Sequence, residues 1–138
     1  MKLEEMWNKY LELNNLSDMD YGAYEYDDLN IKKILEGKKK AEISLYDSYD
    51  NVEPLPIKGD HALVLNTSGD AICVIKNNNV RLIDFKAVKK LYKLLGYDNY
   101  EDFSNDNILS LEDDLKTMNK SLTDETIIIL EEFDVVYK

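Results

Sequence analysis

The sequence is poor in the residues that usually mark a metal or cofactor site. Among 138 residues it has one cysteine, Cys73, one histidine, His61, and five glycines. A lone cysteine cannot form an internal disulfide, and structural zinc takes four protein ligands, mostly cysteine and histidine. Every Ser–His or Cys–His catalytic pair would depend on His61, and the glycines form no phosphate-binding loop. We therefore expect no metal and no cofactor.

Long apolar runs are also missing. No stretch approaches the ~20 apolar residues that a membrane-spanning helix needs, and residues 1–5 are not followed by the apolar segment of a signal sequence. A single cysteine suits a reducing compartment. The sequence therefore predicts a cytoplasmic protein with no membrane association.

Positive charge is scarce. The chain has 28 acidic and 17 basic residues, which gives a net charge of −11. Broad, nonspecific binding of nucleic acid depends on neutralising phosphates, so this balance makes it unfavourable. The one basic run is Lys38-Lys39-Lys40, and Arg81 is the only arginine. An anionic ligand would therefore have to meet a local basic cleft.

The residues that are present predict one domain over residues 1–138, since this length is in the commonest range for a single core. Apolar residues at helical spacing predict helices over residues 3–14, 27–36, 85–95 and 110–120, the last with a capping box of Ser110 and Asp113. Alternating or continuous apolar residues predict strands over residues 41–46, 61–66, 71–76, 80–84 and 126–137. Residues 77–79 are expected to turn, residues 21–26 to form a short extended segment, and the polar stretch 98–107 shows no clear pattern.

Strands joined mainly by hairpins favour antiparallel pairing. The predicted fold class is α+β: a small, mostly antiparallel β-barrel of about five strands with flanking helices. We expect the barrel to be closed or nearly closed, with the segment Gly37–Tyr46 lining a cleft.

One stretch matches a known family pattern, a helix that ends in Gly-Lys-Lys and is followed by a strand: Leu35-Glu36-Gly37-Lys38-Lys39-Lys40-Ala41. Further pieces fit in order and spacing: Ser44-Leu45-Tyr46, Glu53-Pro54-Leu55-Pro56, Lys58-Gly59-Asp60, the apolar hairpin 62–75 and the closing segment 131–137. Over about residues 5–137 the chain resembles the ASCH family. The resemblance implies a barrel similar to the PUA domain, with a cleft between barrel and helices.

The ASCH resemblance also implies a role in RNA binding or in processing RNA-derived molecules. Some members hydrolyse an acetyl amide on modified cytidine, and others are reported as ribonucleases. The amide-hydrolysing members use a lysine two residues after the glycine, a threonine three residues further on, and a glutamate after the barrel hairpins. Lys39 matches the lysine, but Glu42 stands at the threonine position and Gly96 lies near the expected glutamate. Catalysis would therefore rest on Lys39 and Glu42 alone, and the sequence favours a protein that is not an enzyme.

Four residues are predicted to bind a ligand beside the cleft: Lys39, Glu42, Tyr46 and Tyr26. Lys39 has the strand parity of Ala41, so we expect it to point toward the barrel mouth and meet a phosphate or carboxylate. Tyr46 or Tyr26 would offer a face for a base. Each also has a structural interpretation, because a cation stabilises a helix C-terminus and tyrosines at a barrel rim commonly pack.

Three functions stay open at this point. The favoured one is a binding module for RNA or for a modified nucleoside or nucleotide. The second is an altered hydrolase, either an amidohydrolase of acetylated cytidine or a ribonuclease. The third is an acidic protein-interaction domain that keeps only the scaffold.

Overall fold

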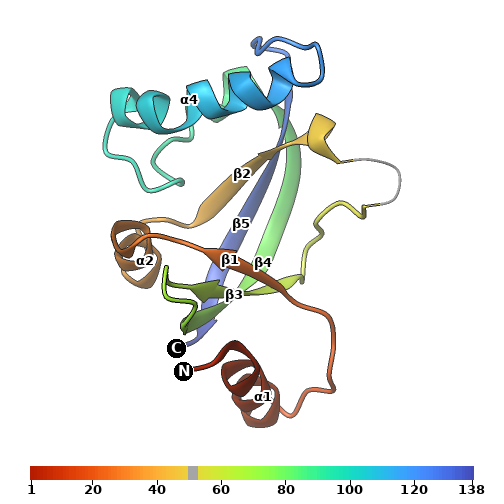
Figure 1. The fold of residues 1–138 in the computed structure, drawn as a ribbon, viewed down its shortest axis with the longest axis vertical. Coiled ribbons are helices and arrows are strands. Elements are labelled where there is room, and N and C mark those ends of the chain that lie inside the picture. Colours follow the sequence, from red (N-terminus) through yellow and green to blue (C-terminus); the bar gives the residue numbers. More distant parts are fainter. Residues whose placement is uncertain (50–52) are drawn as a thin grey trace.

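The computed structural model describes residues 1–49 and 53–138, which fold around one curled five-stranded sheet (Figure 1). The strands are β1 (Gly22–Glu25), β2 (Ala41–Leu45), β3 (His61–Leu65), β4 (Ala71–Asp84) and β5 (Ile127–Tyr137). The helices are α1 (Leu3–Leu13), α2 (Asp28–Leu35), the short 3-10 helix η1 (Tyr46–Ser48), α3 (Phe85–Val88) and α4 (Tyr100–Lys116).

The sheet is a mixed, open half-barrel. Its strand order is β1-β3-β4-β5-β2, in which β1 runs parallel to β3 and the other neighbouring pairs are antiparallel. The prediction of an α+β fold with about five strands is confirmed, but the closed or nearly closed barrel is wrong. The physical reason is that β1 and β2 stand at opposite ends of the sheet, and no ladder joins them among the described residues.

A β-bulge explains why two predicted strands are one. Residues 77–79, predicted as a turn, lie within β4, where the register against β5 shifts between Asn77 and Asn79. Three asparagine side-chain amides of this bulge donate to carboxylates of β5: Asn77 to Glu131 at 3.0 Å, Asn78 to Asp134 at 3.0 Å and Asn79 to Glu132 at 2.9 Å. The partner strand therefore satisfies side chains that commonly favour turns, and the bulge lets the long strand bend.

Helices cover the two ends of the half-barrel. Near the chain termini in Figure 1, α1 buries Met6, Trp7, Tyr10 and Leu11 in a cluster that contains residues of β3 and β4. At the far end, α4 buries Phe103, Leu111 and Leu115 beside apolar residues of β5. The predicted helix 27–36 is α2, and Asp27 caps it by accepting a hydrogen bond from Asn30 N at 2.8 Å. In the described part of the chain, no helix is long and apolar enough to cross a membrane.

Two other helices differ from their predictions. The helix predicted over residues 85–95 ends at Val88, and the following residues pack on the core in turns until Gly96, whose φ is 93°. The helix predicted to begin at Ser110 begins at Tyr100, where Asn99 Oδ1 accepts a hydrogen bond from Asp102 N at 2.9 Å. Between residues 100 and 110 only Phe103 is fully buried, so the polar composition hid the helix.

Candidate functional site

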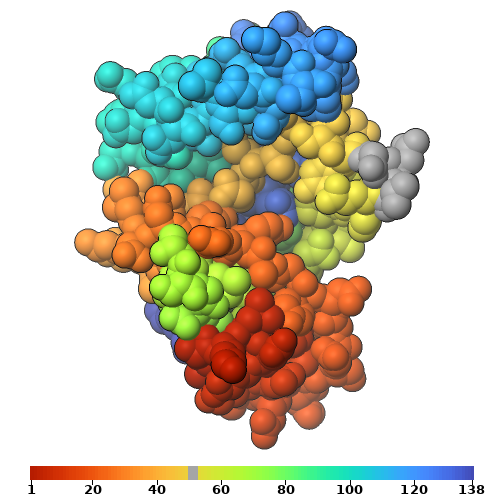
Figure 2. Space-filling model, in the orientation of Figure 1, coloured from red at the N-terminus to blue at the C-terminus, as the bar shows by residue number. Residues whose placement is uncertain are grey.

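A cavity of about 400 Å³ lies between β1, the segment 53–57 and residues of β3, β4 and β5. Figure 2 shows a hollow between the orange surface around β1 and the yellow surface of the segment that leads to β3, with blue atoms of β5 at its base. It lies next to the open side of the half-barrel, where β1 ends the sheet.

The β4 bulge positions one wall of the cavity. Asn77 N donates to Asp60 O at 2.8 Å, and Gly59 N donates to Asn77 O at 2.9 Å. Asp60 Oδ2 in turn accepts a hydrogen bond from Ile57 N at 3.0 Å. Gly59 adopts a φ of 95°, which favours glycine because a side chain would be strained there. The turn 57–60 is thereby fixed to the bulge, and the segment before it is held over the cavity.

Glu131 is the most deeply buried acid that lines the cavity. Its side chain is 8% exposed, and its Oε1 accepts a hydrogen bond from Asn77 Nδ2 at 3.0 Å. Its second carboxylate oxygen has no hydrogen-bond partner among the described residues. Burial raises the pKa of Glu131, the Asn77 hydrogen bond opposes that shift, and the negative charges of Glu42 and Asp60 add to it.

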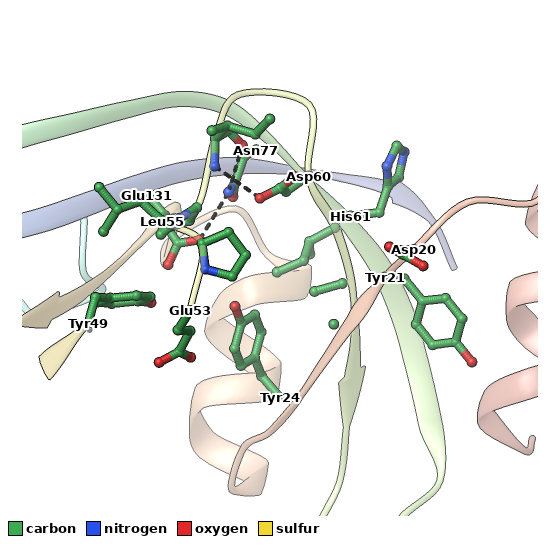
Figure 3. Close-up of a pocket in the computed structure, with 16 residues that line it drawn as sticks. Asp20, Tyr21, Tyr24, Tyr49, Glu53, Leu55, Asp60, His61, Asn77 and Glu131 are labelled. Atoms are coloured by element: carbon green, nitrogen blue, oxygen red, sulfur yellow. Dashed lines mark hydrogen bonds between the residues drawn. The ribbon is translucent and has the colours of Figure 1, made fainter. Parts of the chain in front are cut away.

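Tyrosine hydroxyls face this carboxylate. In Figure 3 the hydroxyls of Tyr24 and Tyr49 point toward the carboxylates of Glu131 and Glu53. Burial raises the pKa of Tyr24 to about 12, and the charge of Glu131 adds to this. Tyr24 therefore keeps its proton at neutral pH. It can donate one hydrogen bond and also accept one.

No lysine or arginine is among the described residues that line the cavity, whereas four of them are acidic: Asp20, Glu53, Asp60 and Glu131. Of the described residues that line the cavity, only His61 can become a cation near neutral pH, but it is buried and its Nε2 pairs with Tyr10 Oη at 2.9 Å. Burial, followed by the charge of Lys76, lowers the pKa of His61 and keeps it neutral at pH 7. The cavity is therefore negatively charged.

Three of the four predicted ligand residues come together beside the cavity but outside its lining, since Glu42 on β2 is the register partner of Glu131 on β5. Lys39 Nζ lies 3.3 Å from Glu42 Oε2, and Tyr26 Oη donates to the same oxygen at 2.7 Å. Lys39 Nζ also lies 5.8 Å from the centre of the Tyr26 ring. We call Tyr26, Lys39 and Glu42 the seam, because they join the end of β1 to β2 across the open side of the half-barrel.

The seam is electrostatically satisfied. Lys39 is only 5% exposed, and its Nζ also donates to Leu95 O at 3.4 Å. Burial and Glu42 together hold the pKa of Tyr26 far above its ordinary value. Tyr46, the fourth predicted residue, lies in η1, is 40% exposed and makes no described contact with the seam.

Gly96, near which the resemblance places the catalytic glutamate, does lie against Lys39. A Cβ built on Gly96 would stand 3.1 Å from Lys39 Cβ. The chain therefore brings this position to the lysine, but supplies no carboxylate there. Lys39 instead pairs with Glu42, the residue at the threonine position.

The sequence did not predict the cavity residues, because its clearest local signal for ligand binding is the basic run Lys38-Lys39-Lys40. A signal for Glu131 was present, since it has the same strand parity as Ile129 and Phe133, which are buried. A charge at such a position marks either an error in the pattern or a functional group. Asn77 had no such signal, because its role depends on a bulge that the sequence does not reveal.

The family model of the ASCH domain matches residues 18–137. This chain belongs to the ASCH domain family. None of the curated proteins compared with it matches.

Solved structures agree with this assignment at the level of the fold. The ASCH domain from Lactobacillus crispatus has a TM-score of 0.83 at 19% identity, over 98% of this chain and 94% of that one. Protein EF3133 from Enterococcus faecalis has a TM-score of 0.82 at 17% identity, over 98% and 88% of the two chains. A mutant of the ASCH protein from Zymomonas mobilis is more distant, with a TM-score of 0.52 at 12% identity, over 80% and 65%.

Proposed function

We propose that this ASCH domain binds a free nucleoside or nucleobase in the cavity beside β1. The observation that carries the proposal is an open-sided cavity of about 400 Å³ with hydrogen-bonding groups fixed at its wall. Small-molecule sites commonly measure roughly 300–1,000 Å³ and use a few well-placed polar groups for orientation. Here Glu131, held by Asn77, and the hydroxyl of Tyr24 are such groups, and all three residues lie on strands.

The edges of nucleobases suit these groups. Amino and imino N–H groups of bases donate hydrogen bonds, and carboxylates are common acceptors for them in protein–nucleic acid recognition. The tyrosines add apolar ring surface next to their hydroxyls. A single base with its sugar is therefore the ligand class that best matches both the chemistry and the size of the cavity.

Phosphate groups do not suit the cavity. Four carboxylates line it, and lysine and arginine are missing from its described lining. The net charge of −11 also repels phosphate groups over a longer range. The sequence predicted binding of RNA or of a nucleoside or nucleotide. Of these ligands, we propose the unphosphorylated one.

The seam has a positioning role in this proposal. Lys39 and Glu42 hold Tyr26, which follows β1 directly, and β1 carries Tyr24 into the cavity wall. Direct contact of Lys39 with a ligand stays a prediction, but its burial and its pairing with Glu42 favour the indirect role.

The experiment is a calorimetric titration of the protein with the common nucleosides, their methylated forms and the matching 5′-monophosphates. We expect nucleosides to bind and monophosphates to bind at least about tenfold more weakly, equivalent to ~1.4 kcal/mol. Tyr24→Ala should abolish binding, whereas Tyr46→Ala is the matched control, since the two tyrosines are 44% and 40% exposed. Loss of binding in Tyr46→Ala alone, or no nucleoside binding by the wild type, would refute the proposal.

A further inference from the structure

The groups that line the cavity also restrict the charge of its ligand, and this inference rests on the proposed nucleoside site. We infer that the cavity selects a nucleoside whose base carries a positive charge, such as an N-alkylated purine or pyrimidine, over one with a neutral base. Three observations carry the inference: a buried carboxylate with one oxygen left open, a wall that offers mainly acceptors, and the lack of a resident cation.

Glu131 supplies the buried carboxylate. It is more than nine-tenths buried, yet among the described residues only Asn77 binds it, at one of its two oxygens. Figure 3 shows the carboxylate directed into the space that Tyr24 and Tyr49 border. A buried ionised group without an opposite charge is costly, and a ligand cation would remove that cost.

The remaining polar groups of the wall are mainly acceptors. Asn77 Nδ2 is already used, since it donates to Glu131 Oε1 at 3.0 Å and to Ile57 O at 3.4 Å. Asp60 adds a further carboxylate, and the phenol oxygen of Tyr24 accepts as well as donates. A ligand must therefore bring N–H donors, and donors on a cation make the stronger hydrogen bonds.

Lysine and arginine are missing from the described residues that line the cavity. Among the described residues that line the cavity, His61 alone can be protonated near neutral pH, and it is paired with Tyr10. The seam shows the contrast within the same fold, because Lys39 already neutralises Glu42 there. The cavity lacks such a lysine, and the ligand would take its place.

Two isomeric nucleosides test the inference on the wild-type protein. 1-Methyladenosine is protonated and carries a positive charge on its base at pH 7, whereas its isomer N6-methyladenosine has one proton fewer and a neutral base. We expect calorimetry at pH 7 to show 1-methyladenosine binding at least about tenfold more tightly, because its charge-assisted hydrogen bonds to Glu131 are stronger than those of a neutral base. Because both ligands meet the same folded protein, the comparison does not depend on any variant.

Glu131→Gln then locates the effect. Glutamine keeps an oxygen for Asn77 but removes the charge, so the preference for 1-methyladenosine should fall to about twofold or less, in line with the charge term being lost. The matched control is Glu132→Gln, which changes the neighbouring acid on β5 whose contacts are Asn79 and Arg81 rather than the cavity. We expect that variant to keep the wild-type preference.

The outcomes separate the inference from the proposed function. Equal affinity for the two isomers would overturn the inference and leave the nucleoside site standing, whereas no binding of either would overturn both. A short single-stranded RNA that contains one 1-methyladenosine distinguishes the two sources of such a base. Tighter binding of this RNA than of the free nucleoside would overturn the proposed free ligand while supporting the charge preference.

Discussion

Two glutamates of one sheet lie in opposite electrostatic surroundings. Glu42 on β2 has Lys39 Nζ at 3.3 Å and the Tyr26 hydroxyl at 2.7 Å. Glu131 on β5 is more deeply buried, yet its described partner is a single amide, that of Asn77. The negative charge of Glu42 is neutralised by Lys39. The negative charge of Glu131 has no such cation among its described partners.

This difference indicates where a ligand belongs. A charged group that is already paired and hydrogen-bonded within the protein gains little binding free energy from a ligand. A buried group with an open oxygen and a raised pKa is a functional-site candidate for a physical reason, since a ligand can improve its surroundings. The seam thus belongs to the scaffold, and the Glu131 cavity is where binding is expected.

The largest expected effect comes from breaking the seam. Lys39→Met should destabilise the fold by about 2–4 kcal/mol, because it leaves Glu42 and the Tyr26 hydroxyl without their cation. Urea denaturation measures this, and Lys40→Met is the control, since Lys40 is exposed. The double variant Lys39→Met with Glu42→Gln should recover most of the loss. A loss of less than ~0.5 kcal/mol would show that the seam is not structural.

The next effect concerns the bulge that holds Glu131. Asn77→Ala should cost about 1–3 kcal/mol, because it leaves a buried carboxylate without its amide and removes the side-chain hydrogen bond to Ile57 O. Asn78→Ala is the matched control, since Asn78 makes a similar but exposed bond to Asp134 and should cost about 0.5 kcal/mol or less. Equal losses of unfolding free energy in the two variants would contradict a structural role of the Asn77 side chain beyond that of Asn78.

A smaller effect tests the hydrogen bond across the open side of the sheet. Tyr26→Phe keeps the ring near Lys39 and removes only the hydroxyl that donates to Glu42, so we expect a loss of about 1 kcal/mol. Tyr46→Phe removes an exposed hydroxyl and should change the free energy of unfolding by less than ~0.5 kcal/mol. Thermal unfolding of the two variants gives the comparison directly.

The smallest effect has the opposite sign. Glu131→Gln should raise the free energy of unfolding at pH 7, because the neutral amide removes a buried charge that has no cation beside it. The pKa of Glu131 is raised, so its contribution to stability is present at pH below its ordinary value and is lost as the pH rises through the raised value. The gain of the variant should therefore shrink on acidification. A variant less stable than the wild type at pH 7 would contradict the account.

Local patterns predicted most of the elements of the fold. The apolar spacing of residues 3–14 and 127–137 and the cap at Asp27 are determined by neighbours in sequence, and the structure has them where they were expected. The bulge in β4 was not predictable, because the amides of residues 77–79 are satisfied by β5, more than 50 residues away. The parallel pairing of β1 with β3 was not predictable either, because it also joins residues far apart in sequence, such as Gly22 and Ala62.

The candidate site was less predictable than the fold. Lys39, Glu42 and Tyr26, which the sequence predicted as ligand residues, contact one another in the structure, and their role toward a ligand stays a prediction. The sequence could not show that Lys39 would be buried by the chain around Leu95 and Gly96. The cavity assembles residues from β1, β4, β5 and the turn before β3, so its members share no local motif. Glu131 is the cavity residue that the sequence could have indicated, because it is a charged residue at an apolar position of a predicted strand.

The most direct test of this account is the pKa of Glu131, measured by carbon NMR of its carboxyl group and assigned with Glu131→Gln. The charged and titratable groups that influence it are Glu42 on β2, Asp60 in the turn before β3, and Tyr24 and Tyr26 from the β1 segment. We expect the free protein to titrate above the ordinary value for glutamate, and the midpoint to fall when 1-methyladenosine is added, because a cation stabilises the ionised carboxylate. A midpoint at or below the ordinary value, unmoved by this ligand, would contradict the account.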